Sequence, residues 1–404
     1  MRILHLFPYP LYPPQNGGQL RCFHLLQELA REHEVHALLF QRRDELRSPA
    51  AGYAFPENVQ VHNPPPTPPR TVFDWLPRRL GPGLHYRWLR RSWRGPASGV
   101  VLAMQPLLLP LLTGQAFDLV LFESLDAMMA APLVRRWGPQ ARLVLDAHNI
   151  DHKLIPAAEV KAYRATRWAE THLAGAVDAF LACSETDRRE LETLNRHEIA
   201  GYTIPNGVDT SQRPFDDNPL KAQSTTILFC GTLNYEPNRD GLLWLHANIW
   251  PLIRAQVPAA RLMVVGRNGD LADYDTMKAD GSVDFIGEVE SVLPYSQTAG
   301  IAIVPLRHGS GTRLKILEAM SLGNPVVSTR IGAEGIEAVD GREILLADSP
   351  EAIAAGVVRL LRQPELFESQ RRAARQLVEE KYDWRVIGRQ LRRGLEEIIG
   401  KRNA

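Results

Sequence analysis

The sequence predicts an α/β fold made of two domains, each with a doubly wound parallel sheet. Short apolar runs rich in β-branched residues alternate with stretches of helical spacing along almost the whole chain, a pattern typical of such sheets. The length of 404 residues favours two or three domains, and an apolar fraction of 45% suffices for two sizeable cores. A polar segment without periodicity, residues 211–224, divides the elements into two series.

The first series of elements begins at the amino end. Residues 18–31 carry apolar side chains at helical spacing, so we expect a helix there. Ser184 and the residues that follow it to Asp187 resemble a capping box, which predicts the start of another helix. Strands are expected at residues 3–7, 35–40, 119–122, 143–145 and 179–183.

The second series has the same alternation and closes with two helices. The last helix is predicted from an apolar stripe that includes Leu391 and Leu395. Strands are expected at residues 226–230, 262–265, 283–286, 301–304, 325–328 and 344–346, and the two helices near residues 364–381 and 384–399.

Residues 309–328 are the most informative part of the chain. Gly309 and Gly311 follow a predicted strand, and glycine lets the backbone approach a ligand closely. The free N–H groups at the start of the following helix attract an anion, and Arg313 and Lys315 add two positive charges there. The segment therefore predicts a phosphate site, although a similar turn also occurs in crossovers that bind no ligand.

The same helix predicts a nucleotide rather than a bare phosphate. Glu318 lies one turn beyond Lys315, where its carboxylate can accept hydrogen bonds from a ribose. Gly323 is expected to end the helix before the next strand. The segment lacks the third glycine of the dinucleotide fingerprint and the ending of a P-loop, so both of those nucleotide folds are disfavoured.

The parallel sheets also predict where ligands bind. In open sheets of this kind, ligands lie beyond the carboxyl ends of the strands. Two such domains that face each other are expected to form a cleft, which suits a reaction between a nucleotide-linked donor and a second substrate.

Composition narrows the class of protein further. A net charge of +1 gives no overall field that attracts nucleic acid. Cys22, Cys183 and Cys230 lie far apart in apolar stretches, so we interpret them as small buried side chains in a reducing cytoplasm. The apolar run at the amino end is too short for a signal peptide, and no run approaches the roughly 18 residues of a membrane-spanning helix. We therefore expect a cytoplasmic protein.

Several short motifs occur in an order that resembles one known family. They are Gly17-Gly18, His148-Asn149, the run from Pro205 to Asp209, Gly231-Thr232-Leu233, Val265-Gly266 and the run from Gly311 to Val327. This order resembles glycosyltransferase family 4, the group 1 glycosyltransferases, over nearly the whole chain. The resemblance implies a GT-B fold, in which two Rossmann-like domains face each other across a cleft and the last helix crosses back to the first domain.

The resemblance also implies an activity. Members of the family transfer a sugar from a nucleotide donor with retention of anomeric configuration and need no metal. We expect no cofactor, and two partners: a nucleoside-diphosphate sugar, and a hydroxyl acceptor that is a glycan, a lipid-linked molecule or a small molecule. The expected reaction belongs to polysaccharide, glycolipid or glycoconjugate synthesis. Residues 1–210, joined by the helix at 385–404, are expected to bind the acceptor, residues 211–224 to be a linker, and residues 225–384 to bind the nucleotide sugar.

Carried over residue by residue, the resemblance assigns roles to single side chains. His148 is expected at the reacting sugar, with Asp146 and Asp151 as weaker candidates for orienting it. Arg313 and Lys315 are expected to neutralise the leaving diphosphate, and with His148 they form the expected catalytic set. The residues expected to bind the donor are Gly17, Gly18, Gly231, Thr232, Gly266, Arg267, Ser310, Gly311, Thr312, Leu314 and Glu318. Arg267 flanks the base, or else is a solvated surface arginine.

The sequence departs from the family pattern at two places. Ser310 stands where family members usually carry a second glutamate, eight residues before Glu318, so the sugar's hydroxyls must be recognised differently. An arginine and a lysine that many members carry after the first strand of the second domain are also missing. We infer that their positive charge has moved to Arg313 and Lys315.

No pair of carboxylates and no nucleophile stands out for the transfer itself. A retaining transfer is still feasible if the leaving diphosphate takes the acceptor proton on the same face of the sugar. Asp273-Tyr274-Asp275 matches a metal-binding pattern of the other large glycosyltransferase fold, but its polar surroundings favour a solvated loop. Two alternatives stay open: a sugar-nucleotide epimerase of the non-hydrolysing kind, and a nucleotide-binding scaffold without transfer activity.

Residues 70–94 hold seven arginines, one acidic residue and three tryptophans. A basic and aromatic segment suits the headgroup region of anionic lipid, so we expect peripheral contact with the inner face of the membrane. The alternative is an arginine-rich helix whose tryptophans pack on the first domain. Nucleic acid is not an expected partner, because no recognised module accompanies the segment.

Overall fold

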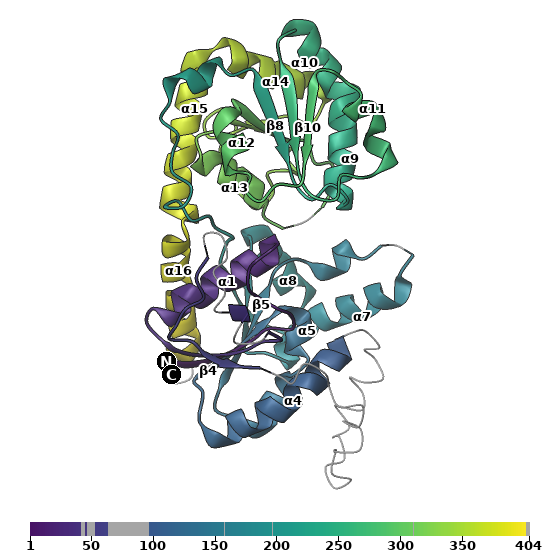
Figure 1. Cartoon of the computed structure of the whole chain (residues 1–404). Coiled ribbons are helices and arrows are strands. Elements are labelled where there is room, and N and C mark those ends of the chain that lie inside the picture. The colour runs from purple at the N-terminus through teal and green to yellow at the C-terminus, as the bar shows by residue number, and fades with distance from the viewer. Residues whose placement is uncertain are drawn as a thin grey trace. The chain divides into compact units, whose positions relative to one another are not determined.

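The computed structural model describes residues 1–41, 45–46, 53–63, 97–156, 158–195, 197–309 and 311–400, with backbone only for residues 97–103. The chain forms two compact units (Figure 1). Unit 1 comprises Met1–Pro205 and Ile387–Ala404, and unit 2 comprises Asn206–Val386. The predicted basic segment, residues 70–94, lies outside the described residues.

Unit 1 is built on a parallel sheet with the strand order β3-β2-β1-β4-β5-β6-β7 among the described residues. The chain runs outward from β1 to β3, then returns to the other side of β1 and runs outward again to β7. The elements of this unit are β1 (Arg2–Leu6), α1 (Gly17–Ala30), β2 (Glu34–Leu38), β3 (Gln60–His62), α4 (Ala97–Gly114), β4 (Leu119–Glu123), α5 (Ser124–Met128), α6 (Ala131–Trp137), β5 (Arg142–Ala147), η1 (Asp151–Leu154), α7 (Val160–Glu170), η2 (Leu173–Gly175), β6 (Ala179–Ala182), α8 (Glu185–Leu194) and β7 (Ala200–Thr203).

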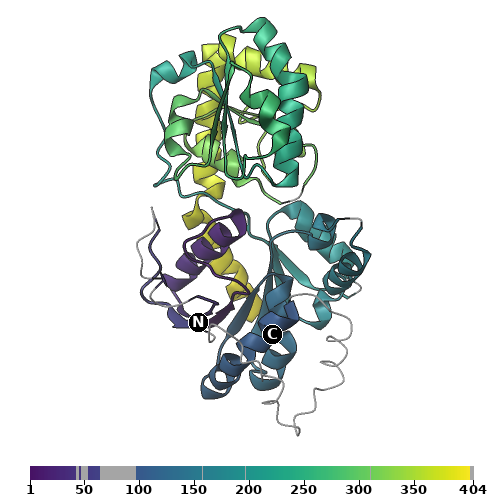
Figure 2. The same ribbon diagram turned by 45° about the vertical axis from the view of Figure 1, so that its right-hand side comes forward.

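The last helix, α16 (Trp384–Gly400), belongs to unit 1 from Ile387 onward. Arg392 joins it to α1 through hydrogen bonds to the Glu28 carbonyl at 2.9 Å and to its carboxylate at 3.2 Å. A Cβ at Gly388 would lie 2.2 Å from the Glu28 carboxylate, so a glycine is needed for the two helices to approach this closely. Figure 2 shows α16 in yellow beside the purple α1.

Unit 2 is built on a second parallel sheet, with the order β10-β9-β8-β11-β12-β13. Its elements are η3 (Pro219–Gln223), β8 (Thr226–Cys230), α9 (Glu236–Trp244), η4 (Leu245–Ile249), α10 (Trp250–Gln256), β9 (Arg261–Val265), η5 (Ala272–Tyr274), α11 (Asp275–Lys278), β10 (Val283–Gly287), α12 (Leu293–Thr298), β11 (Ile301–Val304), α13 (Leu314–Ser321), β12 (Val326–Ser328), β13 (Leu345–Leu346), α14 (Pro350–Arg362), α15 (Pro364–Leu377) and η6 (Val378–Tyr382).

Helices cover both faces of the second sheet, as a doubly wound fold requires. Ile301 and Ile303 of β11 join a core with residues of α9, α10 and α14, whereas the alternate residues Ala302 and Val304 join a core with α13 and α15. Figure 1 shows the strands between α9 and α11 on one side and α12 and α13 on the other. The continuous apolar run of β11 is therefore explained by burial on both faces.

Residues 211–224, expected as a linker, lie in unit 2 rather than between the units. The Phe215 ring lies under the Arg371 guanidinium, at 4.6 Å from the ring centre. The Lys221 ammonium donates to the Asp216 carboxylate and to the carbonyls of Ser296 and Leu322, each at 3.2 Å. Residues 211–224 show no apolar periodicity because single side chains, rather than the face of a helix or strand, attach them to unit 2.

Two local predictions about helix ends are confirmed. The Ser184 hydroxyl accepts a hydrogen bond from the Asp187 backbone N–H at 3.0 Å and caps α8. Gly323 has a φ of 75° and ends α13, with its N–H donating to the Met320 carbonyl at 3.2 Å. Within the described residues, no helix combines the length and the apolar character needed to cross a bilayer.

Candidate functional site

In unit 2 the candidate site lies where the strand order reverses. β8 and β11 are neighbours, but the chain leaves them toward opposite edges of the sheet. The loops that follow these two strands therefore diverge and leave room for a ligand at the carboxyl ends. Gly231 follows β8 directly, and the glycine turn after β11 leads into α13.

Lys315, in the first turn of α13, reaches the loop that follows β8. Its ammonium donates to Asn238 Oδ1 at 2.7 Å, and Asn238 Nδ2 donates to the Thr232 carbonyl at 2.9 Å. Burial lowers the pKa of Lys315 to about 8, and the neighbouring Arg313 guanidinium acts in the same direction. The lysine is therefore a cation whose charge is poorly solvated, which favours an anionic partner.

Two predicted donor-binding glycines make this arrangement possible. A Cβ at Gly231, whose φ is 154°, would lie 2.7 Å from Asn238 Nδ2 and 2.8 Å from the Lys315 ammonium. A Cβ at Gly266 would lie 1.8 Å from the Gly231 carbonyl oxygen. Both positions require glycine because the protein's own atoms pass close by, whether or not a ligand does.

The other predicted cations occupy different places. The half-buried Arg267 donates from Nε to the Thr232 hydroxyl at 3.4 Å, so it also reaches the loop after β8. Arg313 is the residue before α13, and its guanidinium lies over Gly309, where a Cβ would come within 2.6 Å of Nη2. Sequence reasoning expected Arg313 and Lys315 at the phosphate site. Arg267, predicted either to flank the base or to be a solvated surface arginine, is half-buried and contacts the loop after β8.

Glu318 lies one turn beyond Lys315 on α13, as predicted. Its carboxylate accepts a hydrogen bond from Arg213 at 3.5 Å, and its side chain is 35% exposed. The side chains of Thr312 and Leu314 are buried and half-buried, respectively, and Leu314 packs on the apolar core beneath α13. Gly311 has a φ of 78°, which favours glycine, and Ser310 lies outside the described residues.

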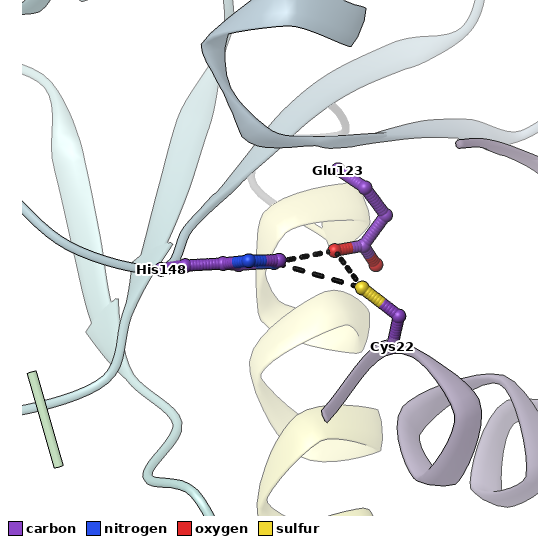
Figure 3. Close-up of side chains that lie close together, drawn as sticks. All are labelled: Cys22, Glu123 and His148. Atoms are coloured by element: carbon purple, nitrogen blue, oxygen red, sulfur yellow. Dashed lines mark hydrogen bonds and ion pairs between the residues drawn. The ribbon is translucent and has the colours of Figure 1, made fainter. Parts of the chain in front are cut away.

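In unit 1, polar side chains gather beyond the carboxyl ends of β1, β4 and β5, again where the strand order reverses. Figure 3 shows His148, which follows β5, pointing at Glu123, the last residue of β4, and at Cys22 of α1. His148 Nε2 donates to Glu123 Oε2 at 2.7 Å and lies 3.7 Å from Cys22 Sγ. Asp146 Oδ2 lies 3.6 Å from the same nitrogen.

Glu123 is fully buried between two histidines. One of its oxygens accepts from His148 and the other from His5 Nε2. Burial alone would raise the pKa of Glu123, but the two histidines hold it below its ordinary value. Burial would lower the pKa of His148, yet Cys22, Asp146 and Glu123 raise it well above the usual range. Both shifts favour an imidazolium hydrogen-bonded to a carboxylate.

The two acids proposed to orient His148 differ in the structure. Asp146 is buried and accepts two hydrogen bonds from Arg21 of α1, at 2.8 Å and 2.7 Å, so its position beside His148 is fixed. Asp151 instead contacts Glu170, to which its backbone N–H donates at 2.6 Å. Burial and then the charge of Glu170 raise the pKa of Asp151 to about 7.

Gly17 and Gly18 form the first turn of α1, which Asn16 caps by accepting from the Gln19 N–H at 3.0 Å. A Cβ at Gly18 would lie 3.5 Å from His148 Nδ1. The histidine therefore faces Glu123 with one nitrogen and the glycine turn with the other. His148 and Gly18 therefore lie beside each other; that they bind the donor stays a prediction.

The Asp273-Tyr274-Asp275 pattern was expected in a solvated loop; both aspartates are exposed, but Asp273 and Tyr274 lie in η5 and Asp275 begins α11. Asp273 pairs with Arg239, and the buried Tyr274 hydroxyl donates to the Leu233 carbonyl at 2.7 Å. The central tyrosine therefore packs the short helix onto the loop after β8, and one of the two carboxylates already has a cationic partner.

Sequence reasoning missed several residues of both sites. Cys22 was expected to be only a small buried side chain, but its thiol donates to Glu123 at 3.1 Å. Glu123 had a signal, since it is an acid placed directly after a predicted apolar strand. Asn238 and Arg213 had none, because their partners lie far away in the sequence.

Two family models match the chain, one in each half. The family described as Glycosyltransferase Family 4 matches residues 15–212, and that described as Glycosyl transferases group 1 matches residues 224–363. A phosphatidyl-myo-inositol mannosyltransferase of Mycolicibacterium smegmatis is 29% identical over 54% of this chain and 57% of that protein. A glycogen synthase of Mycobacterium tuberculosis is 27% identical over 54% of each. The chain thus spans about half the length of the curated relatives it matches.

Solved structures resemble the chain over nearly its whole length. Sucrose-phosphate synthase from Thermosynechococcus elongatus has a TM-score of 0.72 at 16% identity and covers 99% of both chains. Anabaena Alr3699/HepE in complex with UDP has a TM-score of 0.69 at 15% identity, covering 98% of this chain and 100% of that one. At such identities the likeness shows the fold alone.

Proposed function

Because this chain belongs to the group 1 glycosyltransferases of family 4 and has their GT-B fold, we propose that it transfers a sugar from a nucleoside-diphosphate donor to a hydroxyl acceptor. The acceptor and the pathway are those of polysaccharide, glycolipid or glycoconjugate synthesis. The mannosyltransferase and glycogen synthase relatives are consistent with glycolipid and polysaccharide products.

One observation supports this proposal more than any other: the contact between Lys315 and Asn238 at the point where the second sheet reverses. It brings a buried ammonium and the start of α13 to the loop after β8, where an anionic group gains from both. Arg267 reaches the same loop through Thr232. A diphosphate bound there is within one helical turn of Glu318, which we assign to the ribose.

We assign His148 to the transfer step. As an imidazolium it donates from Nδ1, the nitrogen that faces the glycine turn at Gly18, to a hydroxyl of the sugar or to the reacting centre. Glu123 and Asp146 hold the ring in that orientation. Among the described residues, the carboxylates of Glu123 and Asp146 lie beside His148, and both already accept hydrogen bonds. We therefore propose that the leaving diphosphate takes the acceptor proton and that the transfer retains configuration without a metal.

A panel of UDP-, GDP- and ADP-sugars, read by thermal unfolding, tests the proposal. A donor that binds the native state raises the unfolding temperature with its concentration, and one base should stand out. Incubation of that donor with glycan and lipid-linked acceptors should then yield a glycosylated product, and a chelator should not lower the rate.

The His148→Ala variant is the matched control. It should keep the thermal shift, because nucleotide binding belongs to unit 2, but its kcat should fall about 10²–10³-fold, the usual cost of one hydrogen-bond donor to developing charge. A panel in which no nucleotide sugar stabilises the protein contradicts the assignment. Conversion of the donor alone into an epimer would replace it with the epimerase.

A further inference from the structure

Cys22, Glu123 and His148 bring three kinds of metal-ligand atom together in unit 1. Their Sγ, carboxylate and Nε2 atoms all lie within 4.8 Å of one another (Figure 3). A thiolate, an imidazole and a carboxylate are the ligands that zinc takes in proteins. We propose that these three side chains form a zinc site, and that bound zinc inhibits the enzyme because it occupies His148. The inhibition rests on the function proposed above; the binding does not.

The distances fit zinc after a small adjustment. Cys22 Sγ lies 3.7 Å from His148 Nε2 and 3.1 Å from Glu123 Oε2, and the latter two atoms are 2.7 Å apart. Bond lengths of about 2.0–2.3 Å in a tetrahedron put such ligand atoms about 3.3–3.6 Å apart. The thiol is already near these separations. The histidine and the carboxylate must move apart by about half an ångström, which replaces their hydrogen bond with two metal bonds.

The ligands are held by regular structure rather than by a free loop. Cys22 comes from the second turn of α1, Glu123 ends β4, and His148 follows β5, whose strand is paired with β4. Fixed ligands lose little conformational freedom when a metal binds. The His148 side chain is 13% exposed, whereas the other two are buried, so an ion reaches the site along the imidazole.

Outer contacts support the same ligands. His5 donates to the oxygen of Glu123 that does not face Cys22, and the Tyr9 hydroxyl lies 3.3 Å from Cys22 Sγ. Such contacts orient metal ligands and are worth about 10–100-fold in affinity at known sites. The protons on Cys22 Sγ and His148 Nε2 leave to solvent when zinc binds, so binding releases about two protons and tightens as the pH rises.

A second group with metal-ligand atoms, Glu236, Asp240 and His308 in unit 2, serves as a contrast. Glu236 and His308 are exposed, and Asp240 is bound by Arg307, with one contact of 2.9 Å. The negative charge of Asp240 is therefore already compensated by Arg307, and none of the three residues supplies a thiol. We expect no tight zinc binding there, which makes His308→Ala a useful control.

The test is a calorimetric titration of zinc chloride into the chelator-stripped full chain. We expect one tight site in the wild type, a loss of at least about 100-fold in affinity for Cys22→Ser, and no change for Cys183→Ser or His308→Ala. Cys183 is a buried cysteine of the same unit whose thiol donates to the Ala147 carbonyl at 3.7 Å, so its variant controls for loss of a thiol.

Cobalt in place of zinc keeps the test decisive if Cys22→Ser fails to fold. Wild-type protein with cobalt should show the thiolate-to-metal charge-transfer absorption of a cysteine ligand, and Cys183→Ser should show it too. A cobalt complex without that absorption, absence of zinc binding, or equal binding by Cys22→Ser overturns the site. If zinc binds but the transfer rate is unchanged, the inhibition is wrong while the site stands. A protein that binds added zinc but transfers no sugar even after the zinc has been removed contradicts the proposed function instead.

Discussion

At the scale of single residues, the most consequential side chain is Lys315. The half-buried side chain donates to Asn238, and its ammonium lies 5.2 Å from the centre of the Phe229 ring, a cation–π contact; desolvation nevertheless disfavours its charge. That cost is released when an anion binds beside it. Because Gly231 leaves the space that the ammonium occupies, the site depends on a residue with no side chain.

The lowered pKa of Lys315, about 8, predicts how nucleotide binding depends on pH. The ammonium attracts the diphosphate and the neutral amine does not, so the affinity is full below pH 8 and falls as the pH rises through it, by at most roughly tenfold per unit. Titration calorimetry of the selected nucleoside diphosphate between pH 7 and 9.5 measures this. This pH range begins below the Lys315 pKa of about 8 and ends where the amine is largely neutral.

Two variants separate this effect from other titrating groups. Lys315→Arg keeps its charge at high pH and should bind with little pH dependence. Lys315→Met should bind more weakly than the wild type below pH 8, by about 1.5–3 kcal/mol, the usual worth of a hydrogen bond to a charged group, and this difference should shrink as the pH rises above 8. Unaltered pH dependence in Lys315→Met would show that another residue causes it.

The sequence identifies candidate site residues but not the residues that contact them. Lys315, Glu318 and His148 follow from their place after strands or within a helix, which a local pattern reveals. Glu123 and Asn238 touch them only because the sheets bring distant segments together. Long-range contacts of this kind leave no periodic trace in one sequence, so these partners had to come from the structure.

At the scale of elements, α13 is defined at its carboxyl end by Gly323. The Asn324 N–H donates to the Ala319 carbonyl at 2.9 Å, and Gly323 donates to Met320, a pairing that needs a left-handed residue between them. A Cβ at Gly323 would also lie 2.8 Å from the Phe215 ring. The glycine thus fixes both the length of the helix and the path of residues 211–224 against it.

Gly323→Ala should therefore lower the free energy of unfolding by at least about 1–2 kcal/mol, the cost of a left-handed alanine. Urea denaturation measures the change. Gly356→Ala is the matched control: this residue lies inside α14, and its Cβ would meet Leu345 and Val327 at 3.6 Å, an ordinary contact. It should stabilise the protein by about 0.5–1 kcal/mol. Effects of the same sign would contradict this account.

Most strands are predictable because a strand that is buried on both faces requires a continuous run of apolar residues. β3 and β7 were not predicted, and they are the two edges of the first sheet. Gln60–His62 holds a single apolar residue, and Ala200–Thr203 includes Gly201, against which the Phe180 ring packs. An edge strand pairs on one side only and needs less apolar surface, so its pattern is weak.

At the scale of the whole molecule, the chain leaves unit 1 at Pro205 and re-enters it at Ile387. Ile387, Leu391 and Leu395 of α16 are fully buried, so the last helix is part of a core rather than a tail. The burial of each of these three side chains contributes roughly 1.5–3 kcal/mol. Together they are a large share of the net free energy of unfolding of a domain.

Two leucine variants should show that α16 stabilises unit 1. Leu391→Ala in α16 and Leu360→Ala in α14 each remove a fully buried leucine, at a cost of about 2–5 kcal/mol. In calorimetric unfolding, Leu360→Ala should lower the temperature of the transition that the nucleotide shifts upward. Leu391→Ala should lower the temperature of the other transition. If both variants lower the same transition, the two units do not unfold separately.

The return of the chain to unit 1 reverses the order in which the halves are completed during synthesis. Asn206–Val386 leaves the ribosome as one uninterrupted stretch and can finish folding at once. Unit 1 cannot complete its core until α16 has been synthesised, and until then the surface that α16 covers stays exposed. We therefore expect released chains truncated shortly before Ile387 to hold a protease-resistant second half and a chaperone-dependent first half.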